Sequence, residues 1–375
     1  MKSNSKIAIV SGETSGDQYA ALLACSLKKI VPDAEIIGVG GSKLRTSEIR
    51  PIAEHPLSGT FGFSGVMKTI YQQAKFLSTC TRAFKKEKPD LVVFIDNPGF
   101  NLALAKNLYD VKKIYYIPPK IWAHNYQRIF LIKHLFEAVV VIFPFEKPIF
   151  EKENIPAYYF GHPVMDLISN AGIDDKEFLK QTDITEKECI IGLFPGSRQE
   201  EIKYILPLLI RAGKIILKKY QVSFVISCAE EKLYQTQKKI LKRENINWPI
   251  WRGSPHTLAR NSKVALAASG TINLEIALCD TPMIVFYKMG RLNYAIARII
   301  VQSKYISPVN IVFGRKVVDE FIQNINWPRF QRVFSNIFEG KEQREEQIQR
   351  FRHLKSVLGE GNISAKVANF IVKCL

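Results

Sequence analysis

The stretch that organises this chain reads IIGLFPGSRQEE over residues 190–201. A short apolar run ends in Pro-Gly-Ser, and an amphipathic pattern follows it. This order predicts a buried strand, a tight turn and the start of a helix. Gly196 suits the turn and leaves room for a ligand, Ser197 is a candidate N-cap, and the guanidinium of Arg198 suits phosphate. Free amides at a helix start favour an anion, so the stretch indicates either a phosphate site or an ordinary turn with a surface Arg.

A similar turn follows a second predicted strand, at Val264–Ala268. Ser269, Gly270 and Thr271 come next, and they offer backbone amides and hydroxyls to a phosphate. Glu275 falls one turn into the following helix, where its carboxylate can accept hydrogen bonds from ribose hydroxyls. The alternative is a capped core helix with an exposed Glu. Two phosphate-type turns in one domain favour the nucleotide interpretation.

Short apolar runs alternate with helical patterns along the whole chain. The N-terminal half opens with a strand, a glycine loop and a helix, but it contains neither the GxGxxG nor the GxxxxGK[ST] pattern. This alternation predicts an α/β fold with parallel sheets and helices on both faces. The other strands are expected at Lys6–Val10, Glu35–Val39, Leu91–Ile95, Ile114–Ile117, Ala138–Ile142, Val222–Ser227, Trp248–Trp251 and Pro282–Tyr287.

Two carboxylates follow predicted strands of the N-terminal half. Glu13 comes after the first strand, and Asp96 comes directly after Leu91–Ile95. Ligands of parallel sheets bind at the carboxyl ends of strands, where a carboxylate can act as a general base. The alternative for Asp96 is a turn residue that caps the next helix. His162, between Gly and Pro, is either a ligand contact or a packed turn residue.

Length and charge limit the class of protein. The chain of 375 residues predicts two domains, and its net charge of +18 implies an anionic partner: nucleic acid, an anionic membrane surface or phosphorylated substrates. No signal peptide is visible, and the longest apolar stretch, around Ala138–Phe145, is too short to span a bilayer. The six cysteines form no CxxC pair, and most lie in apolar runs, so we expect reduced core residues of a cytoplasmic protein.

The segment Thr60–Lys88 interleaves apolar and aromatic residues with lysines. Phe61, Phe63, Met67 and Lys68 illustrate the pattern. Such a segment suits insertion at a membrane interface. The alternative is an amphipathic helix with a core-facing stripe and a solvated basic face.

The motifs, taken in order, resemble the lipid-A-disaccharide synthase family, glycosyltransferases of the GT-B architecture, over nearly the full length. The residues that carry the resemblance are Gly12–Asp17, Gly38–Gly41, Lys88–Asp90, Ile95–Pro98, Pro144–Lys147, Gly161–Pro163, Leu193–Arg198, Ser269–Thr271, Leu274–Glu275, Pro282–Met283, Asn310 and Gly314–Arg315.

The resemblance implies two Rossmann-like domains whose parallel sheets face each other across a cleft. We expect residues 1–165 to form the acceptor- and membrane-facing domain and residues 166–345 the UDP-sugar domain. Residues 346–375 would be C-terminal helices able to pack back on the first domain.

The resemblance also implies an inverting reaction. A UDP-activated 2,3-diacylglucosamine donates its sugar to 2,3-diacylglucosamine 1-phosphate on the inner face of the inner membrane. Asp96 is the candidate base, and Glu13 is its rival or orienting partner. No cofactor or metal is expected. The candidate UDP-sugar residues are Gly196, Ser197, Arg198, Ser269, Gly270, Thr271, Glu275, Asn310 and Arg315. The candidate acceptor and membrane residues are Phe61, Phe63, Met67, Lys68 and Trp122.

The sequence departs from the family pattern at a few positions. Gly99 and Gly65 stand where acidic residues are usual, His124 stands where a second Trp is usual, and Pro308–Asn310 replaces Leu-Pro-Asn. These positions belong to the acceptor side, so a changed acceptor stays open, as does another UDP-sugar enzyme such as a 2-epimerase. A basic nucleic-acid-binding protein is a third alternative, but no recognised binding motif occurs.

Overall fold

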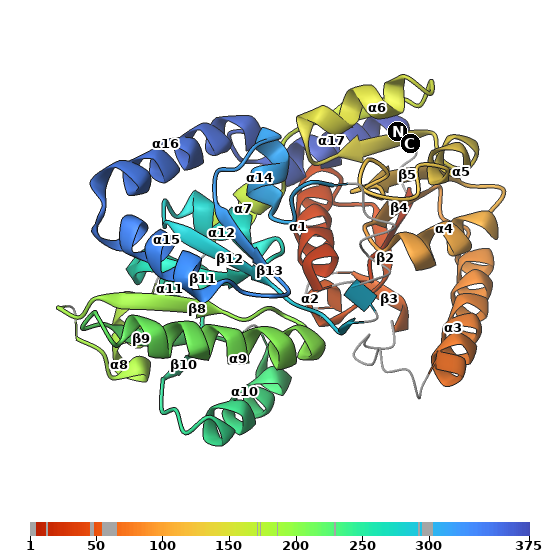
Figure 1. Ribbon diagram of the computed structural model, residues 1–375. Coiled ribbons are helices and arrows are strands. Elements are labelled where there is room, and N and C mark those ends of the chain that lie inside the picture. The colour runs from red at the N-terminus through yellow and green to blue at the C-terminus, as the bar shows by residue number, and fades with distance from the viewer. Residues whose placement is uncertain are drawn as a thin grey trace. The chain divides into compact units, whose positions relative to one another are not determined.

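The computed structural model describes residues 5–12, 14–45, 49–54, 66–170, 172, 174–185, 187–228, 230–291, 293–294 and 303–375. The chain forms two compact units (Figure 1). One unit comprises Met1–Asp166 together with Leu358–Leu375, and the other comprises Leu167–Val357. Each unit contains one parallel sheet with helices packed on it, which confirms the predicted α/β class.

The described strands of the first unit form a seven-stranded parallel sheet in the order β3-β2-β1-β4-β5-β6-β7. Its central strands are continuous apolar runs because both faces are covered by helices. The strands are β1 (Lys6–Val10), β2 (Glu35–Gly40), β3 (Arg50–Glu54), β4 (Leu91–Ile95), β5 (Lys112–Tyr116), β6 (Ala138–Val141) and β7 (Ala157–Tyr159).

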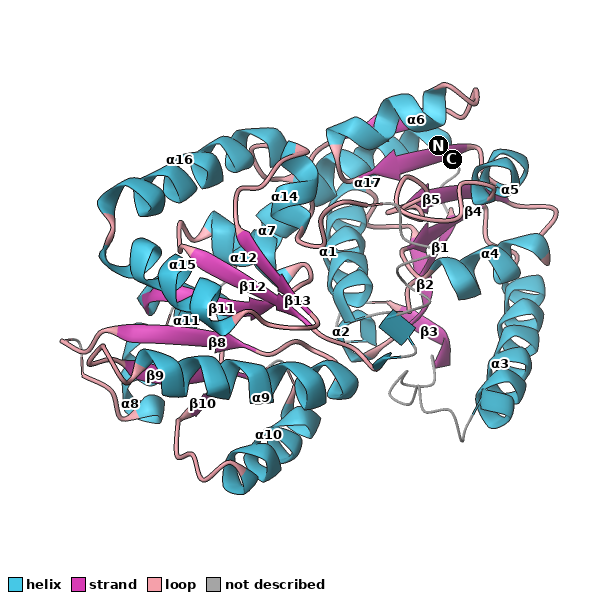
Figure 2. Ribbon diagram, in the orientation of Figure 1, coloured by secondary structure: helices cyan, strands magenta, loops and turns pink. Residues whose placement is uncertain are grey.

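Helices cover both faces of this sheet (Figure 2). One face packs against α3 to α6, and the other packs against α1, on which α17 lies. The helices are α1 (Thr14–Ile30), α2 (Ser42–Arg45), α3 (Val66–Glu87), α4 (Pro98–Lys106), α5 (Arg128–Leu135), α6 (Lys147–Glu151), α7 (Val164–Ser169) and α17 (Ile363–Cys374), with a 3-10 turn η2 (Pro144–Glu146) before α6.

The described strands of the second unit form a six-stranded parallel sheet in the order β10-β9-β8-β11-β12-β13. The strands are β8 (Ile190–Phe194), β9 (Ser223–Ser227), β10 (Ile250–Trp251), β11 (Ser262–Ala268), β12 (Met283–Tyr287) and β13 (Asp319–Ile322). The helices are α8 (Asp175–Thr182), α9 (Gln199–Ile216), α10 (Glu231–Arg243), α11 (Pro255–Asn261), α12 (Ile272–Leu278), α14 (Pro308–Phe313), α15 (Trp327–Glu339) and α16 (Lys341–Leu358).

The strands predicted from apolar runs are all present, with ends shifted by about one or two residues. Sequence reasoning missed β3, β7 and β13, which are edge strands. Edge strands are partly exposed and therefore carry polar residues: β3 reads RPIAE and β13 reads DEFI. Their sequences lack the apolar run by which a central strand is recognised.

The boundary expected at residue 345 falls at Leu358 instead. The reason is that α16 is tied to the second sheet. The side chain of Gln347 exchanges hydrogen bonds with the backbone of Met283, and Lys355 forms an ion pair with Asp280. The shorter segment Leu358–Leu375, which contains α17, belongs to the first unit.

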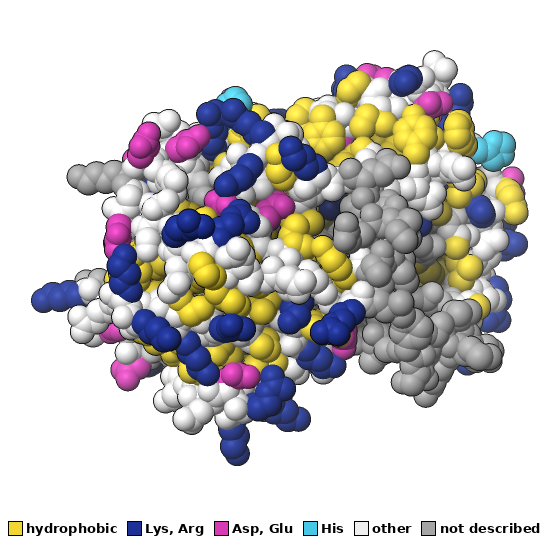
Figure 3. All heavy atoms as spheres, viewed as in Figure 1, with side chains coloured by type: hydrophobic (Ala, Val, Ile, Leu, Met, Phe, Trp, Pro, Cys, Tyr) yellow, Lys and Arg dark blue, Asp and Glu magenta, His cyan; other side chains and the backbone are white. Residues whose placement is uncertain are grey.

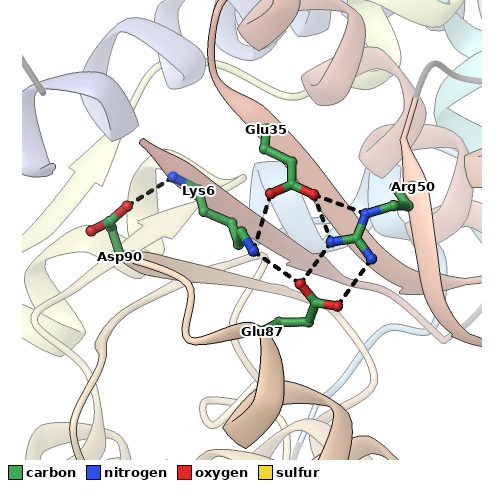
Figure 4. Close-up of polar contacts among 5 residues, drawn as sticks. All are labelled: Lys6, Glu35, Arg50, Glu87 and Asp90. Atoms are coloured by element: carbon green, nitrogen blue, oxygen red, sulfur yellow. Dashed lines mark hydrogen bonds and ion pairs between the residues drawn. The ribbon is translucent and has the colours of Figure 1, made fainter. Parts of the chain in front are cut away.

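An ion-pair network closes the edge of the first sheet where its strands begin (Figure 4). Arg50 Nη2 lies 2.6 Å from carboxylate oxygens of both Glu35 and Glu87, and Lys6 Nζ lies 2.9 Å from Glu87 Oε2. The backbone amide of Lys6 donates to Asp90. This edge is opposite to the one where ligands bind parallel sheets, so the network serves stability.

None of the six cysteines forms a disulfide. Cys80 and Cys228 are buried, as expected of core residues. Cys25 is exposed on α1, so its expected place in the core was wrong. Its neighbours Leu23, Ala24 and Leu27 form the buried face of that helix.

Candidate active site

Asp96 lies in a left-handed turn at the carboxyl end of β4. The φ angles of Asp96 and Asn97 are 52° and 40°. Three hydrogen bonds hold this backbone: Asn101 Nδ2 donates to the carbonyl oxygens of Ile95 and Asp96, and Tyr115 Oη donates to that of Asp96. The N-cap of α4 is Asn97 rather than Asp96. Asp96 is therefore a turn residue that precedes the N-cap position.

Gly16, in the first turn of α1, lies against Asp96. A Cβ placed on Gly16 would lie 3.4 Å from Cβ of Asp96, at the close end of ordinary van der Waals contact. The start of α1 therefore packs beside the carboxyl end of β4. Glu13, the rival candidate for the base, lies outside the described residues.

The buried Asp17 joins two motifs that are separate in the sequence. Its carboxylate accepts hydrogen bonds from the amides of Gly41, Lys43 and Leu44 and from the hydroxyl of Ser11. These bonds tie the start of α1 to the turn after β2. The sequence showed the motifs Gly12–Asp17 and Gly38–Gly41 separately. Their spacing along the chain gives no sign that Asp17 contacts the second motif.

Trp122 lies beyond the carboxyl end of β5, where a buried carboxylate fixes its indole ring. Its Nε1 donates to Glu146 Oε1 at 2.9 Å, and Glu146 Oε2 accepts from the amides of Ile142 and Phe143. The indole meets Phe145 edge to face, with 5.3 Å between ring centroids. Burial raises the pKa of Glu146. The arrangement presents a rigid aromatic surface on the side predicted for the acceptor.

His162 is a packed turn residue. Its Nδ1 accepts a hydrogen bond of 3.1 Å from the amide of Val164, and its ring packs against those of Tyr19 and Phe143. Burial, together with the charge of Lys120, lowers its pKa to about 3, so the imidazole is neutral at pH 7. Of the two alternatives left open by the sequence, the structure favours the packed turn.

The turn after β8 differs in two respects from its prediction. Gly196 takes a φ of 106°, which a glycine accommodates. The N-cap of α9 is Arg198, so Ser197 is not the cap. The amides of Ser197 and Arg198 are not free, because both donate to Glu201 Oε2. A Glu three residues after the N-cap is the capping pattern that could have revealed this.

Arg198 keeps a largely exposed side chain. Its Nη1 lies 3.6 Å from Glu201 Oε1, and 62% of the side chain is accessible. The guanidinium thus lies exposed to solvent beside Glu201, just after the carboxyl end of β8.

The turn after β11 has open space beside Gly270, although the amide of Ser269 donates to the Phe286 carbonyl and that of Gly270 to Asn273 Oδ1 at 3.4 Å. A Cβ placed on Gly270 would meet no described atom within 4 Å, so a ligand could approach closely there. Thr271 is the N-cap of α12. The hydroxyl of Ser269 is used internally, since it donates to the carbonyl oxygen of Ile306 at 2.7 Å.

Glu275 is held by a residue that sequence reasoning missed. Its Oε2 lies 2.8 Å from Nε2 of His256, and the two side chains are only 14% and 8% accessible. His256 comes from the start of α11, after the N-cap Ser254. The alternative, in which Glu275 is exposed on a capped core helix, is therefore wrong about its exposure.

Asn310 is fully buried, and its side chain bonds within its own unit. Its Nδ2 donates to the Val318 carbonyl and to Glu320, and its Oδ1 accepts from the amides of Val317 and Val318. Asn310 therefore fixes the connection from α14 to β13 and has little capacity left for a ligand.

Arg315 is not brought together with the nucleotide turns. It precedes β13, at the edge of the sheet where strands begin, and lines a groove of about 170 Å³ with Lys316 and Arg350. Gly196 and Ser269 follow the ends of β8 and β11, at the other edge. The predicted grouping fails because α14 returns the chain to the start of the next parallel strand.

The predicted membrane residues fall mostly outside what the structure describes. Phe61 and Phe63 lie outside the described residues, as does the departure at Gly65. Met67 and Lys68 fall in α3, where the described side chains begin at residue 72.

The described part of α3 has one core-facing side. Phe76 stacks on Phe100 with 5.1 Å between centroids, and Cys80 and Phe84 are buried. Exposed lysines and an arginine lie on the other side. For this part of the segment the amphipathic alternative holds, with a solvated basic face.

Within the described part of the chain, no three His, Cys, Asp or Glu side chains gather as metal ligands would. None of the described helices is both long and apolar enough to cross a membrane.

The two parallel α/β units, each with its candidate residues at the carboxyl ends of strands, define the GT-B class of fold. A putative UDP-N-acetylglucosamine 2-epimerase from Listeria monocytogenes superposes with a TM-score of 0.67 at 14% identity, covering 97% of this chain and 94% of that one. The UDP-GlcNAc 2-epimerase from Neisseria meningitidis, solved with UDP-GlcNAc, gives 0.62 at 15% identity, covering 98% and 100%. At such identities the likeness shows the fold alone.

The chain belongs to the lipid-A-disaccharide synthetase family, whose family model matches residues 7–373. It is 33% identical to lipid-A-disaccharide synthase from Coxiella burnetii, over 98% of both chains. It is 32% identical to lipid-A-disaccharide synthase 1 from Legionella pneumophila, over 99% of this chain and 98% of that one. The chain is accordingly a glycosyltransferase by family, which confirms the resemblance seen in its motifs.

Proposed function

We propose that this protein transfers 2,3-diacylglucosamine from UDP to the 6-hydroxyl of 2,3-diacylglucosamine 1-phosphate. The products are a β-1,6-linked disaccharide 1-phosphate and UDP. The observation that carries the proposal is the family match along nearly the whole chain. Candidate residues at the carboxyl ends of β4, β8 and β11 support it.

In this proposal Asp96 is the general base. Its carboxylate takes the proton of the acceptor hydroxyl, whose oxygen bonds to the anomeric carbon of the donor while the bond to UDP breaks. An inverting transfer of this kind needs one base and no covalent nucleophile. The left-handed backbone at Asp96 and Asn97 supports the assignment, because strained turns gather at functional sites.

The nucleotide is assigned to the second unit. The guanidinium of Arg198 and the amides near Gly270 and Thr271 would meet the negative charge that develops on UDP. Glu275 would accept hydrogen bonds from the ribose. Because Asn310 is buried, we give it a positioning role, and we leave Arg315 out of the nucleotide site.

The acceptor is assigned to the first unit, where Trp122 stands against Phe145. The edge-to-face pair gives an apolar surface for a sugar ring or an acyl chain. The departure at Gly99 lies in the connection after β4, which carries Asp96. The departure at His124 lies in the connection after β5, which carries Trp122. They therefore bear on which acceptor is used more than on the donor.

The membrane contact is a further part of the proposal: the protein would bind peripherally to the inner face of the inner membrane. Figure 3 shows Lys and Arg side chains spread over the face in view, in keeping with the net charge of +18. The exposed side of α3 adds Lys75, Arg82, Lys85 and Lys86. Basic residues near an anionic leaflet each contribute about 1 kcal/mol to binding.

Vesicle sedimentation tests this contact. The double variant Lys85→Glu and Lys86→Glu should weaken binding to phosphatidylglycerol vesicles about tenfold or more, with no change on neutral phosphatidylcholine. Lys238→Glu with Lys239→Glu, an equal charge change on the exposed side of α10, is the matched control. Equal loss in both variants would show that net charge alone is responsible.

Release of UDP from UDP-diacylglucosamine, measured with and without the lipid acceptor, tests the function. Asp96→Asn should lower kcat about a hundredfold or more, and Arg198→Ala should lower kcat/KM about tenfold or more. The matched controls are Asp33→Asn and Arg332→Ala, both at exposed positions. Full activity of both site variants would refute the site assignment, and an epimerised UDP-GlcNAc product without transfer would refute the reaction.

A further inference from the structure

The buried pair His256–Glu275 has features that a packing contact does not need. The two groups come from neighbouring helices, α11 and α12, whose starts lie close in the fold. The distance between Nε2 and Oε2 is 2.8 Å, which is a full hydrogen bond. The family assignment gives no role to His256, and its position 19 residues before Glu275 matches no sequence motif.

The far side of the imidazole is also fixed. His256 Nδ1 lies 3.3 Å from Oγ of Ser254, and the same oxygen accepts a hydrogen bond from the His256 amide. A hydroxyl that accepts from the amide can donate its own proton to Nδ1. The imidazole then carries its proton on Nε2 and donates it to Glu275. Trp251 Nε1, which donates to the carbonyl oxygen of Ser254, holds this loop in place.

Only one oxygen of the Glu275 carboxylate is engaged in this way. Oε2 faces His256, whereas Oε1 accepts no hydrogen bond from the part of the chain that the structure describes. A largely buried carboxylate with one oxygen anchored and one available is well placed to accept from a neutral hydroxyl donor. Its rotamer is set before any ligand arrives, which reduces the entropy that binding costs.

We infer that His256 is a positioning residue that orients Glu275 toward the ribose of the nucleotide and so makes the site select ribonucleotides. This inference rests on the proposed function, in which Glu275 accepts from ribose hydroxyls. It adds that the selection depends on the imidazole. Without His256 the carboxylate would turn freely, and its contact with the hydroxyls would be shared among rotamers.

A cycle of two ligands and three variants tests the inference. The affinities of UDP and 2′,3′-dideoxy-UDP are measured by calorimetry for the wild-type protein and for His256→Ala, His256→Gln and Glu275→Gln. Their ratio isolates the ribose contact, because all other interactions of the two ligands are shared. The wild-type protein should prefer UDP about tenfold or more, as expected for hydrogen bonds to a carboxylate.

His256→Ala should lower that preference about fivefold while leaving the affinity for dideoxy-UDP within about twofold. His256→Gln, whose amide can donate from the place of Nε2, should restore most of the preference. Glu275→Gln should lower the preference for UDP at least as much as His256→Ala does, because it changes the group that contacts the ribose. His134→Ala, which replaces an exposed histidine on α5, is the matched control and should leave the affinities for both ligands unchanged.

The possible failures are distinguishable. Absence of UDP binding to the wild-type protein would overturn the proposed function and this inference with it. A wild-type preference for UDP that persists unchanged in His256→Ala would overturn the inference alone. If His256→Ala and His256→Gln both weakened the binding of UDP and of dideoxy-UDP equally, the ratio of the two affinities would be intact. That result would show a merely structural role for His256 and would also overturn the inference.

Discussion

The carboxylate of Asp17 accepts a hydrogen bond of 2.7 Å from the backbone amide of Gly41. Residues that are 24 positions apart are thereby joined at the carboxyl edge of the first sheet. The contact also explains why glycines stand at the end of β2 and directly after it: a Cβ on Gly40 would lie 2.8 Å from Asp17 Oδ1, and one on Gly41 would lie 3.0 Å from Oδ2. The two motifs form one structural unit that ties the start of α1 to the turn after β2.

Asp17→Asn should destabilise the first unit by about 3 kcal/mol, because either orientation of the amide places an NH2 against a backbone donor. The change corresponds to a fall in Tm of about 6 °C or more. Thermal unfolding followed by circular dichroism measures it. Asp33→Asn, an exposed substitution, is the control. An unchanged Tm for Asp17→Asn would mean that the carboxylate does not hold the turn.

The sequence allowed the central strands to be predicted, because burial on both faces leaves long apolar runs such as those of β4 and β8. The positions of Asp96 directly after β4 and of Glu275 in the helix after β11 followed from the same runs. The edge strands β3 and β13 could not be found, since exposure removes their signal. Patterns along the chain thus predicted in which strand, turn or helix a residue lies, but not which residues its side chain contacts.

Contacts through space were the part that no pattern reported. His256 meets Glu275 because two helices pack side by side, and Asp17 meets Gly41 because two turns share an edge. Arg315 was misplaced for a related reason, since a crossover through α14 puts it at the other edge of its sheet. The capping by Glu201 is different, because its spacing from Arg198 was readable and was overlooked.

The indole of Trp122 should depend on Glu146 for its orientation. In Glu146→Gln either orientation of the amide leaves a donor facing another donor, the indole N–H or the amides of Ile142 and Phe143. We expect the KM for the lipid acceptor to rise about fivefold, with the KM for the UDP-sugar within about twofold. The free energy of unfolding should fall by about 1–3 kcal/mol.

Steady-state kinetics with each substrate varied in turn distinguishes these effects. Trp122→Phe keeps an aromatic ring but loses the N–H, so it should raise the same KM. Tyr126→Phe, an exposed aromatic position in the same connection, is the matched control. A rise confined to the KM of the UDP-sugar would contradict the assignment of this surface to the acceptor.

Acid should loosen the amino edge of the first sheet. Hydrogen bonds from Arg50 and then Lys6 lower the pKa of Glu87 to about 2, and the same two partners lower the pKa of Glu35. A carboxyl group with a depressed pKa stabilises the folded state above its unfolded value of 4.5, and this stabilisation is lost as the pH falls toward 2. The stabilisation removed by Glu87→Gln is therefore present at neutral pH and absent in strong acid.

Tm measured from about pH 7 down to about pH 2.5 gives the comparison. The Tm difference between wild-type protein and Glu87→Gln should be constant above about pH 5 and should shrink below pH 4.5. Glu360→Gln, at an exposed position of the same unit, controls for the loss of one negative charge. A difference that grows on acidification would have the wrong sign for a depressed carboxyl pKa.

Asp166 should determine whether α17 stays attached to the first unit. Its Oδ1 accepts from the amide of Ile363 at 3.0 Å and its Oδ2 from that of Ser364 at 2.7 Å, so it caps a helix that lies almost 200 residues later. The N-cap residue itself, Asn362, provides no side-chain cap. Asp166→Ala leaves two buried helix-start amides unpaired, which costs about 2 kcal/mol or more.

Hydrogen exchange measured by mass spectrometry reports this loss locally. Amides of α17 should exchange about thirtyfold faster in Asp166→Ala, since about 2 kcal/mol of local stability is removed. Amides of β11 in the second unit serve as the internal reference and should keep their wild-type rates. If exchange rose equally in α17 and β11, the substitution would act on the whole chain, and the capping role would be refuted.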